Sequence, residues 1–274
     1  PPAVSSDFTT NVDVLSGTAN NDTFNGTLGT GATISVLDTL AGGNGTDTLN
    51  ITDVTGAQAM INTINISSIE VVNVRSVGDV GVTGGALNAN AFSLAGLAAT
   101  TVNVTQGSNV FLFANAASDI NVTNVAVTGS IQLDGGDAVT VITDDATTGV
   151  VIGGVTGPAG AVDVTHSNAT TGSVTIDGGT TVTIDVDGQT TGAIAVGGTT
   201  AGTGNVVITN TGADVATATD NPLGTVSAAS AGNINITSVA TLDDSAVAVD
   251  SAAGTASFGV TTATAGASTT SVTV

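Results

Sequence analysis

One glycine-rich segment combines the residue types and the spacing of a metal-binding turn. Residues 42–50, GGNGTDTLN, fit the nonapeptide G-G-x-G-x-D-x-U-x at every defined position, which is the pattern of calcium-binding turns that lead into β-solenoid strands. Calcium takes about six to eight oxygen ligands in flexible geometry. The glycine-rich bend offers backbone carbonyls, and Asp47 offers a carboxylate. The sequence therefore predicts Ca2+ as a cofactor, bound by Asp47, Asn44, Gly42 and Gly45.

A degenerate copy of this segment lies 25 residues earlier in the chain. It has Thr18 and Asn20 where the pattern has glycine, and Asn tolerates a left-handed backbone better than most residues. One turn supplies too few oxygens for calcium, so we expect two turns stacked one coil apart to share an ion. The aligned positions are Asp13 with Asp38, Leu15 with Leu40, Gly17 with Gly42, Asp22 with Asp47, and Phe24 with Leu49.

The carboxylates of this tandem segment fall into two groups. Asp22 occupies a motif position and is a predicted calcium ligand, together with Asn20. Asp13 and Asp38 lie four residues before the first glycine position of each copy. Two interpretations of this second group stay open, because these residues either complete the calcium shell or cap the bend.

Five further aspartates are secondary candidates for calcium. D-G-G turns begin at Asp134 and at Asp177, but such turns are also common in ordinary hairpins. Two other aspartates share one face of a predicted strand, where carboxylates repel each other unless a cation or solvent intervenes. The secondary candidates are Asp134, Asp137, Asp177, Asp185 and Asp187.

The chain offers few side chains for catalysis. It has no cysteine, tryptophan or tyrosine, and His166 is its only histidine, at a strand-to-turn position where we expect it on the surface. No G-x-S-x-G nucleophile motif occurs. Paired carboxylates hydrolyse sugars in other proteins, but carbohydrate-active clefts generally use aromatic platforms. The sequence therefore predicts a protein that is not an enzyme.

The charge is strongly one-sided. The formal net charge is -21, from 22 acidic residues against a single arginine, and Glu70 is the only glutamate. Aspartate suits turns and cation sites, whereas a salt-adapted acidic surface, the alternative, normally contains abundant glutamate. A chain this negative repels phosphates, which excludes nucleic acid as a partner. No apolar run approaches the roughly 20 residues of a membrane-spanning helix.

Small and β-branched residues dominate the composition and predict an all-β fold. Residues 128–170 and 171–213 form a repeat with a constant offset of 43, and each unit contains about four short strands. This spacing predicts two coils of about 21 residues per unit, in an elongated β-solenoid with little helix. A β-sandwich has a similar strand density and is the alternative.

Two regions follow from these patterns. We expect a calcium-binding β region over residues 1–100, with one or two short helices at 55–64 and 86–99. We expect a β-strand-repeat region over residues 101–274, with Val, Ile and Leu facing inward and Thr, Asp, Asn and Ser facing outward.

Residues 7–75 resemble secreted bacterial RTX-type proteins, most closely the surface-layer and biofilm-matrix proteins that are rich in β-strand repeats. The segments that carry the resemblance are VDVLSGTANNDTFNGT, LDTLAGGNGTDTLNIT and ISSIEVVNV. The resemblance implies export before folding, calcium-dependent folding outside the cell, and a structural role.

The charge argument leads to the same expectation. At -21 the chain resists compaction and contact with copies of itself, and each bound divalent ion offsets two charges. We expect an extracellular structural subunit that folds and self-assembles with calcium into a filament or surface layer. In this homopolymer a terminal strand, from residues 1–12 or 268–274, would pair with the neighbour. The alternatives are a monomeric adhesin stalk or ligand-binding module, and an ice-binding β-solenoid, which T-x-T faces such as 181–183 suggest.

Overall fold

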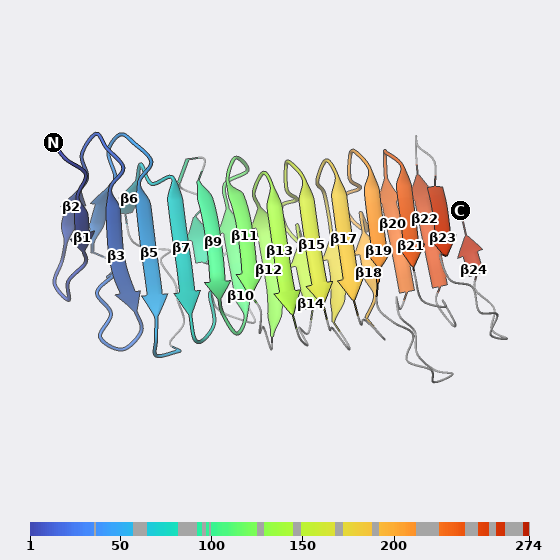
Figure 1. Cartoon of the computed structure of the whole chain (residues 1–274), viewed down its shortest axis with the longest axis horizontal. Helices are drawn as coiled ribbons and strands as arrows, with labels where there is room; N and C mark the ends of the chain where they lie inside the picture. Colours follow the sequence, from blue (N-terminus) through green and yellow to red (C-terminus); the bar gives the residue numbers. More distant parts are fainter. Residues whose placement is uncertain are drawn as a thin grey trace.

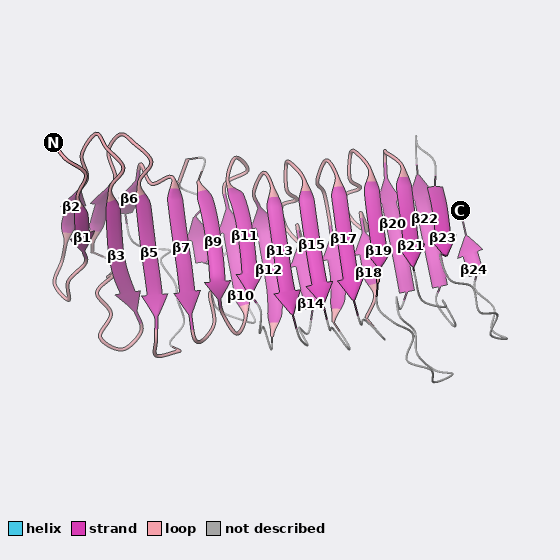
Figure 2. Cartoon of the chain, in the orientation of Figure 1, coloured by secondary structure: helices cyan, strands magenta, loops and turns pink. Residues whose placement is uncertain are grey.

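The chain forms parallel β-sheets whose strands follow one another along one long axis (Figures 1 and 2). In this computed structural model the described residues contain strands and turns but no helix. The fold is a parallel β-solenoid, as predicted, and the sandwich alternative is wrong because the neighbouring strands pair in parallel. The structure describes residues 1–35, 37–56, 65–81, 92–94, 97–98, 100–124, 129–144, 149–167, 172–187, 192–211, 225–238, 246–251, 256–260 and 271–273.

The odd-numbered strands build a 12-stranded sheet in the order of the chain. Its members are β1 (Ser5–Asp7), β3 (Thr23–Leu28), β5 (Thr48–Asp53), β7 (Val71–Ser76), β9 (Thr101–Gln106), β11 (Asp119–Asn124), β13 (Val139–Asp144), β15 (Val162–Ser167), β17 (Val182–Asp187), β19 (Val206–Asn210), β21 (Ile234–Ser238) and β23 (Ala256–Val260).

The even-numbered strands build two further sheets on the other side of the core. A 3-stranded sheet holds β2 (Val14–Ser16), β4 (Thr39–Ala41) and β6 (Asn65–Ser67). A 9-stranded sheet holds β8 (Phe92–Leu94), β10 (Val110–Ala114), β12 (Ser130–Gly135), β14 (Gly149–Ile152), β16 (Ser173–Ile176), β18 (Ile194–Val196), β20 (Thr225–Ser230), β22 (Ala246–Ser251) and β24 (Ser271–Thr273).

The strand register confirms both repeats that the sequence predicted. Leu15 lies opposite Leu40 in neighbouring coils, and Phe24 lies opposite Leu49, at the 25-residue offset of the tandem segment. In the second region Ile131 pairs with one residue of β14, which in turn pairs with Val174. The 43-residue repeat therefore spans two coils of the solenoid.

The core consists of apolar rows that run along the axis. Alternate residues of each strand point inward, so register-paired positions stack one above another. One row begins at Phe24 and Leu49 and continues through a buried aliphatic residue in each coil as far as Ile234. These side chains are at most 1% exposed. Burial of small β-branched side chains against the next coil therefore provides the main stabilisation, about 25 cal/mol per Å2 of apolar surface.

The 12-stranded sheet has no interruption between the two predicted regions. Strand β9 pairs with β7 on one side and with β11 on the other. Figure 1 shows strands that stay nearly parallel along the axis, with the two termini at opposite ends. Flat sheets of many strands are unusual and are typically stabilised by stacking or by side-chain ladders. A ladder of asparagine side chains is present in this sheet.

Two local predictions need correction or fall outside the described residues. Residues 92–94, inside the predicted helix at 86–99, form strand β8, which adds to the sheet through β10. Most of that segment, and residues 57–64 of the other predicted helix, lie outside the described residues. His166 is 0% exposed, so its predicted surface position is wrong. The reason is strand alternation, because His166 shares the inward face of β15 with Val162 and Val164.

Candidate functional site

The two glycine-rich turns lie directly against each other, so closely that their glycines are required. Asn44 donates its backbone N–H to the carbonyl oxygen of Thr18 at 3.2 Å. A Cβ atom on Gly17 would overlap the carbonyl oxygen of Gly42, and a Cβ atom on Gly42 would overlap the carbonyl oxygen of Ser68. The tandem turns are therefore stacked one coil apart, in the arrangement that the sequence predicted.

The second turn also needs glycine for its backbone angles. Gly43 and Gly45 have φ values of 109° and 127°, which side chains rarely adopt. A Cβ atom on Gly45 would lie 2.7 Å from the carbonyl oxygen of Asn20. Carbonyl oxygens of the first turn thus face the glycines of the second, while the side chains of Asn20 and Asn44 are exposed.

Three carboxylates occupy equivalent positions in successive coils, each directly before a strand of the 12-stranded sheet. They belong to Asp22, Asp47 and Glu70, before β3, β5 and β7. Asp22 donates its backbone N–H to Asp47 Oδ1 at 2.7 Å, and Asp47 donates its own to Glu70 Oε2 at 2.8 Å. The backbone of Val4 bonds to Asp22 Oδ1 at 2.6 Å in the same way. Each carboxylate therefore accepts a hydrogen bond from the backbone of the preceding coil.

Glu70 was not among the predicted site residues. The available signal was its position directly before the apolar strand VVNV, where Asp22 and Asp47 precede TFNG and TLNI. A search for the aspartate of the nonapeptide passes over a glutamate, although both side chains present the same carboxylate.

Asp22 shows how the coil backbone stabilises a buried carboxylate. Its side chain is 1% exposed, and burial alone raises the pKa of a carboxyl group. The backbone N–H groups of Thr18 and Val4 and the Thr18 hydroxyl all donate to this carboxylate. Because these hydrogen bonds outweigh burial, the net pKa of Asp22 lies below its usual value of 3.8.

Asp47 has the chemistry that a cation requires. It is 0% exposed, and its second oxygen, Oδ2, has no hydrogen-bond partner. A buried carboxylate oxygen without a partner is costly unless a cation or water compensates it. In the residues that the structure describes, no group of three or more His, Cys, Asp or Glu side chains converges on one point. Asp47 Oδ2 is therefore the candidate cation ligand of the two turns, and backbone carbonyls and water would have to supply most of the remaining ligands of a calcium ion.

Asp13 and Asp38 act as caps in the geometry of the structure. They precede β2 and β4, and Asp13 donates its backbone N–H to Asp38 Oδ1 at 2.9 Å. Asp38 Oδ2 accepts the backbone N–H of Ser35 at 2.6 Å, and Asp13 Oδ2 accepts that of Thr9 at 2.7 Å. Of the two interpretations left open by the sequence, these bonds favour capping.

Asp134 and Asp177, the aspartates of the D-G-G turns, hold the following coil. Asp134 Oδ1 accepts the backbone N–H groups of Val155 and Thr156 at 2.7 and 3.1 Å. Asp177 Oδ1 accepts those of Thr199 and Thr200 at 2.7 and 3.2 Å. Asp134 is 0% exposed and its Oδ2 has no hydrogen-bond partner, as in Asp47. It is therefore the only secondary candidate with the same unsatisfied oxygen among the described residues.

The remaining secondary candidates lie at the surface. Asp137, Asp185 and Asp187 are exposed. Along the sheet Asp185 lies between Thr165 and Thr209, so the neighbouring coils bring no second carboxylate beside it. The structure does not bring these three residues together with the motif turns.

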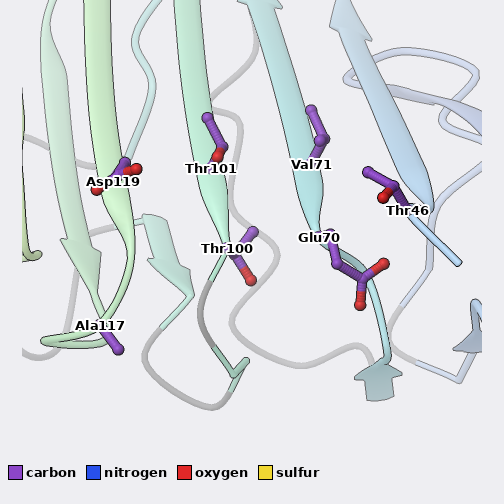
Figure 3. Close-up of a pocket in the computed structure, with 7 residues that line it drawn as sticks. All are labelled: Thr46, Glu70, Val71, Thr100, Thr101, Ala117 and Asp119. Carbon is purple, nitrogen blue, oxygen red and sulfur yellow. The ribbon is translucent and has the colours of Figure 1, made fainter. Parts of the chain in front are cut away.

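A cavity of about 240 Å3 lies beside Glu70, the last of the stacked carboxylates (Figure 3). It runs along the starts of β5, β7, β9 and β11, and Figure 3 shows the carboxylates of Glu70 and Asp119 at two of these starts. Its lining consists of Thr46, Glu70, Val71, Thr100, Thr101, Ala117 and Asp119. The cavity continues the acidic strip of Asp47 and Glu70, so we treat it as part of the same candidate site.

An asparagine ladder crosses the outer face of the first strands, and sequence reasoning missed it. Each side-chain amide donates from Nδ2 to the Oδ1 atom of the previous coil, at 2.8–3.0 Å. Asp7 accepts the first of these bonds. The ladder consists of Asn25, Asn50, Asn73, Asn103 and Asn121.

The ladder gives the outer face a regular and nearly uncharged pattern. In β3, β5 and β9 the asparagine is flanked by threonines, in the segments TFNGT, TLNIT and TVNVT. Arg75 and Asp119 are the charged side chains at the corresponding flanking positions of β7 and β11. Such a face on a chain of net charge -21 is a second feature with possible binding chemistry.

His166 lies in the core and takes no part in these sites. Its register neighbours are Thr143 and Val186, which are 1% exposed. Burial disfavours the charged imidazolium and lowers the pKa of His166 to about 4. The side chain is therefore neutral at pH 7.

Comparisons with known sequences do not assign the chain to a family. No described helix is long and apolar enough to cross a membrane. No protein-family model matches the chain, and no curated protein sequence matches it.

Proposed function

We propose that this chain is an extracellular structural subunit whose folding and self-assembly depend on calcium. The observation that carries the proposal is Asp47 Oδ2, a buried carboxylate oxygen without a partner, inside two stacked glycine-rich turns. The resemblance of residues 7–75 to RTX-type surface-layer and biofilm-matrix proteins supports the same function. No enzymatic activity is part of the proposal.

Calcium would act by compensating charge between coils. Asp22, Asp47 and Glu70 follow one another along the axis at a coil spacing of about 4.8 Å, and like charges at that separation oppose stacking. The predicted ligands are Asp47, with Asp22 beside it, and backbone carbonyls of the two turns. Binding free energy that is available only in the folded state becomes folding free energy.

An elongated solenoid suits a structural subunit. Its coils bury one continuous core, and its stability grows by adding neighbours in one dimension. The cavity beside the acidic strip contains no histidine, because the only histidine of the chain is buried in the core. These features favour a scaffold over a catalyst.

The test compares calcium with chelator in the wild-type chain and in Asp47→Asn. The amide keeps an acceptor for the Asp22 N–H but lacks the charge that binds calcium. At free calcium 100-fold above its Kd, we expect the wild-type free energy of unfolding to rise by about 2.7 kcal/mol, measured by urea denaturation, and the rise to be absent in Asp47→Asn. Electron microscopy and sedimentation should show assemblies of the wild type in calcium and monomers in EGTA.

Asp137→Asn is the matched control, because it removes the same charge from an exposed position. It should keep the full calcium response. Identical stability and particle size of the wild type in calcium and in EGTA would refute the proposal. A full response in Asp47→Asn would place the ion elsewhere, with Asp134→Asn as the next variant.

A second candidate function is binding to ice, and the Thr-x-Asn-x-Thr face favours it. The ladder holds the amides in fixed positions, threonine side chains have restricted χ1 angles, and the strands of the sheet lie nearly parallel to one another in Figure 1. A rigid, uncharged array of donors and acceptors that repeats at every coil is suited to an ordered lattice of water.

Thermal hysteresis separates this candidate from the first. Thr48→Lys places a charge on the Thr-x-Asn-x-Thr face and should abolish any hysteresis. Thr175→Lys, at a half-buried position of β16 in the opposite 9-stranded sheet, should leave it unchanged. Absence of hysteresis in the wild type at millimolar concentration would remove ice binding from consideration.

A further inference from the structure

We propose that Asn44–Gly45, in the second glycine-rich turn, is a deamidation site at which the chain converts its own asparagine to aspartate or isoaspartate. The chain contains two Asn-Gly pairs, Asn25–Gly26 and Asn44–Gly45. Glycine after asparagine favours deamidation, because no side chain hinders the backbone nitrogen that attacks the amide. The fold leaves one of these pairs free to react and holds the other. The consequence for calcium binding rests on the proposed function, whereas the reaction itself does not.

The reaction needs only water in addition to the chain. The backbone nitrogen of Gly45 loses its proton to the solvent and attacks Cγ of Asn44, which forms a succinimide ring. The bond between Cγ and Nδ2 breaks, and Nδ2 leaves as ammonia. Water then opens the ring at either of its carbonyl carbons. Opening at the side-chain carbonyl gives aspartate, and opening at the backbone carbonyl gives isoaspartate.

Asn44 and Gly45 meet both requirements of this reaction, which are an amide that is free to rotate and a backbone N–H that is free to lose its proton. Both residues are exposed. Among the described residues, no hydrogen bond uses the side-chain amide of Asn44 or the backbone N–H of Gly45. Asn44 donates its own backbone N–H to the carbonyl oxygen of Thr18 at 3.2 Å. Thr46 donates its backbone N–H to Asn21 Oδ1 at 2.9 Å. The attacking nitrogen therefore lies between two bonded N–H groups and is itself unbonded.

Asn25–Gly26 meets neither requirement. Asn25 Nδ2 donates to Asp7 Oδ1, and Asn25 Oδ1 accepts from Asn50 Nδ2, both at 2.9 Å. Gly26 is buried inside β3, where it pairs with Ile51 of β5. The side chain would have to leave the ladder, and the strand would have to open, before the ring could form. Local opening of a paired strand costs free energy, which lowers the rate of the reaction.

Isoaspartate would change the length of the turn that carries the candidate calcium site. It places an extra carbon atom in the backbone between position 44 and Gly45. The bond from Asn44 to Thr18, and the close approach of Gly45 to the carbonyl oxygen of Asn20, depend on the present length. A longer backbone would not keep both contacts, so the stacked turns would separate. Aspartate keeps the backbone length and adds a negative charge three residues before Asp47.

Bound calcium would slow the reaction. Ring formation requires the Asn44 side chain to fold back onto the nitrogen of Gly45, so the turn must change its backbone angles. An ion held by carbonyl oxygens of this turn opposes that change, because it stabilises the folded arrangement of the turn. The calcium-free chain would therefore deamidate faster than the calcium-bound chain.

Peptide mapping of the full chain tests the site. The protein is incubated in EGTA at mildly alkaline pH and is then digested with a protease that cleaves before aspartate. The digestion places Asn25 and Asn44 in separate peptides, 22–37 and 38–46. We expect peptide 38–46 to gain the mass difference between an amide and an acid at least about tenfold faster than peptide 22–37. Aspartate creates a new cleavage site in peptide 38–46 and isoaspartate does not, so the two products are counted separately.

Two controls separate the role of the fold from that of the sequence. In Asn44→Gln the ring would be larger and would form far more slowly, so the mass of peptide 38–46 should stay constant. In urea the ladder and the strand no longer protect Asn25, so both peptides should change at similar rates. The proposal is overturned if peptide 38–46 of the folded chain does not change, or if both peptides of the folded chain change at equal rates.

Urea denaturation of the incubated protein, in calcium and in EGTA, distinguishes this site from the proposed function. The stabilisation by calcium should decrease in the incubated wild type in proportion to its isoaspartate, while Asn44→Gln should match its own fresh sample. If the wild type keeps its full response despite isoaspartate, the stated effect on the stacked turns is wrong. If fresh wild type does not respond to calcium, the proposed function fails and the deamidation site stands. Equal deamidation rates in calcium and in EGTA would mean that this turn holds no ion.

Discussion

The glycine-rich turns of the first region and the D-G-G turns of the second fasten neighbouring coils with the same chemical group, but in opposite directions along the axis. In the first region Asp47 accepts a backbone N–H from Asp22, in the preceding coil. In the second region Asp134 accepts from Val155 and Thr156, in the following coil. A buried carboxylate bonded to backbone N–H groups is thus a general device of this fold. Glycines in close contact with a neighbouring coil also occur in both regions, at Gly42 against the Ser68 carbonyl and at Gly204 against the Thr180 carbonyl, whereas the complete nonapeptide occurs in the first region alone.

The outer face of the 12-stranded sheet also changes along the axis. The asparagine ladder begins in the first region and ends at Asn121 of the second, and every rung bonds to the next. The same row continues in the second region as Thr140, Asp163 and Thr183. Threonine on both sides keeps like charges apart there. Residues that face each other in neighbouring strands must not repel. Amides that bond to each other satisfy this condition, and so does a carboxylate that lies between two threonines.

The largest expected effect concerns the close contact between turns in the first region. Gly42→Ala would place a methyl group against the carbonyl oxygen of Ser68 and 2.6 Å from Asp47 Oδ2. Because both the backbone and a buried side chain must move, we expect a loss of about 4 kcal/mol in the free energy of unfolding. Urea denaturation measures it.

Gly198→Ala in the second region is the matched control, because the nearest atom to its added methyl group is 4.0 Å away. We expect a change within about 0.5 kcal/mol. Equal costs for the two variants would mean that the turns of the first region are no tighter than an ordinary loop.

The second prediction separates the regions by their response to acid. The pKa of His166, in the second region, is about 4 in the fold and 6.5 for an ordinary histidine. As pH falls from 6.5 to 4 the unfolded chain binds a proton that the fold excludes, so stability should decrease by about 3 kcal/mol. The pKa of Asp22, in the first region, is lowered from 3.8, so its contribution is present above pH 3.8 and is lost only below it.

Urea denaturation of the wild type and of His166→Leu between pH 7 and pH 4 checks this prediction. The variant should lose the part of the slope that begins near pH 6.5, even if its stability at pH 7 differs. An unchanged slope would show that the imidazole is protonated in the fold.

Much of the fold followed from the sequence because its repeats are regular. The offset of 25 residues predicted the pairs Leu15–Leu40 and Phe24–Leu49, and both are register partners. Strand alternation also indicates that His166 is buried, because Val162, Val164 and His166 are alternate residues of one strand and therefore share a face. The predicted surface position was wrong because it relied on the general polarity of histidine instead of this alternation.

The asparagine ladder was harder to predict because the coils differ in length. Successive rungs are separated by 25, 23, 30 and 18 residues, so no constant period connects them. The roles of the acidic residues were also only partly predictable. Their spacing indicated stacked turns. Which backbone N–H each carboxylate accepts depends on how far each loop is displaced along the solenoid axis, and the sequence spacing does not determine this displacement.

The smallest expected effect tests the ladder itself. Asn73 donates to Asn50 and accepts from Asn103, at 2.8 and 2.9 Å. Since both bonds are partly exposed to water, Asn73→Ala should cost about 1–1.5 kcal/mol in the free energy of unfolding. Thr183→Ala is the control in the second region, because its register neighbours are Asp163 and Val207, which carry no amide.

A double variant sharpens this comparison. If the amides act as a connected ladder, Asn50→Ala combined with Asn73→Ala should cost less than the two single changes together, by about 0.5–1 kcal/mol, because the bond between them is counted in both. Strictly additive costs, or an equal cost for Thr183→Ala, would mean that each asparagine contributes only its own strand preference. The regular outer face of β3 to β11 would then need another cause, such as the packing of the core rows beneath it.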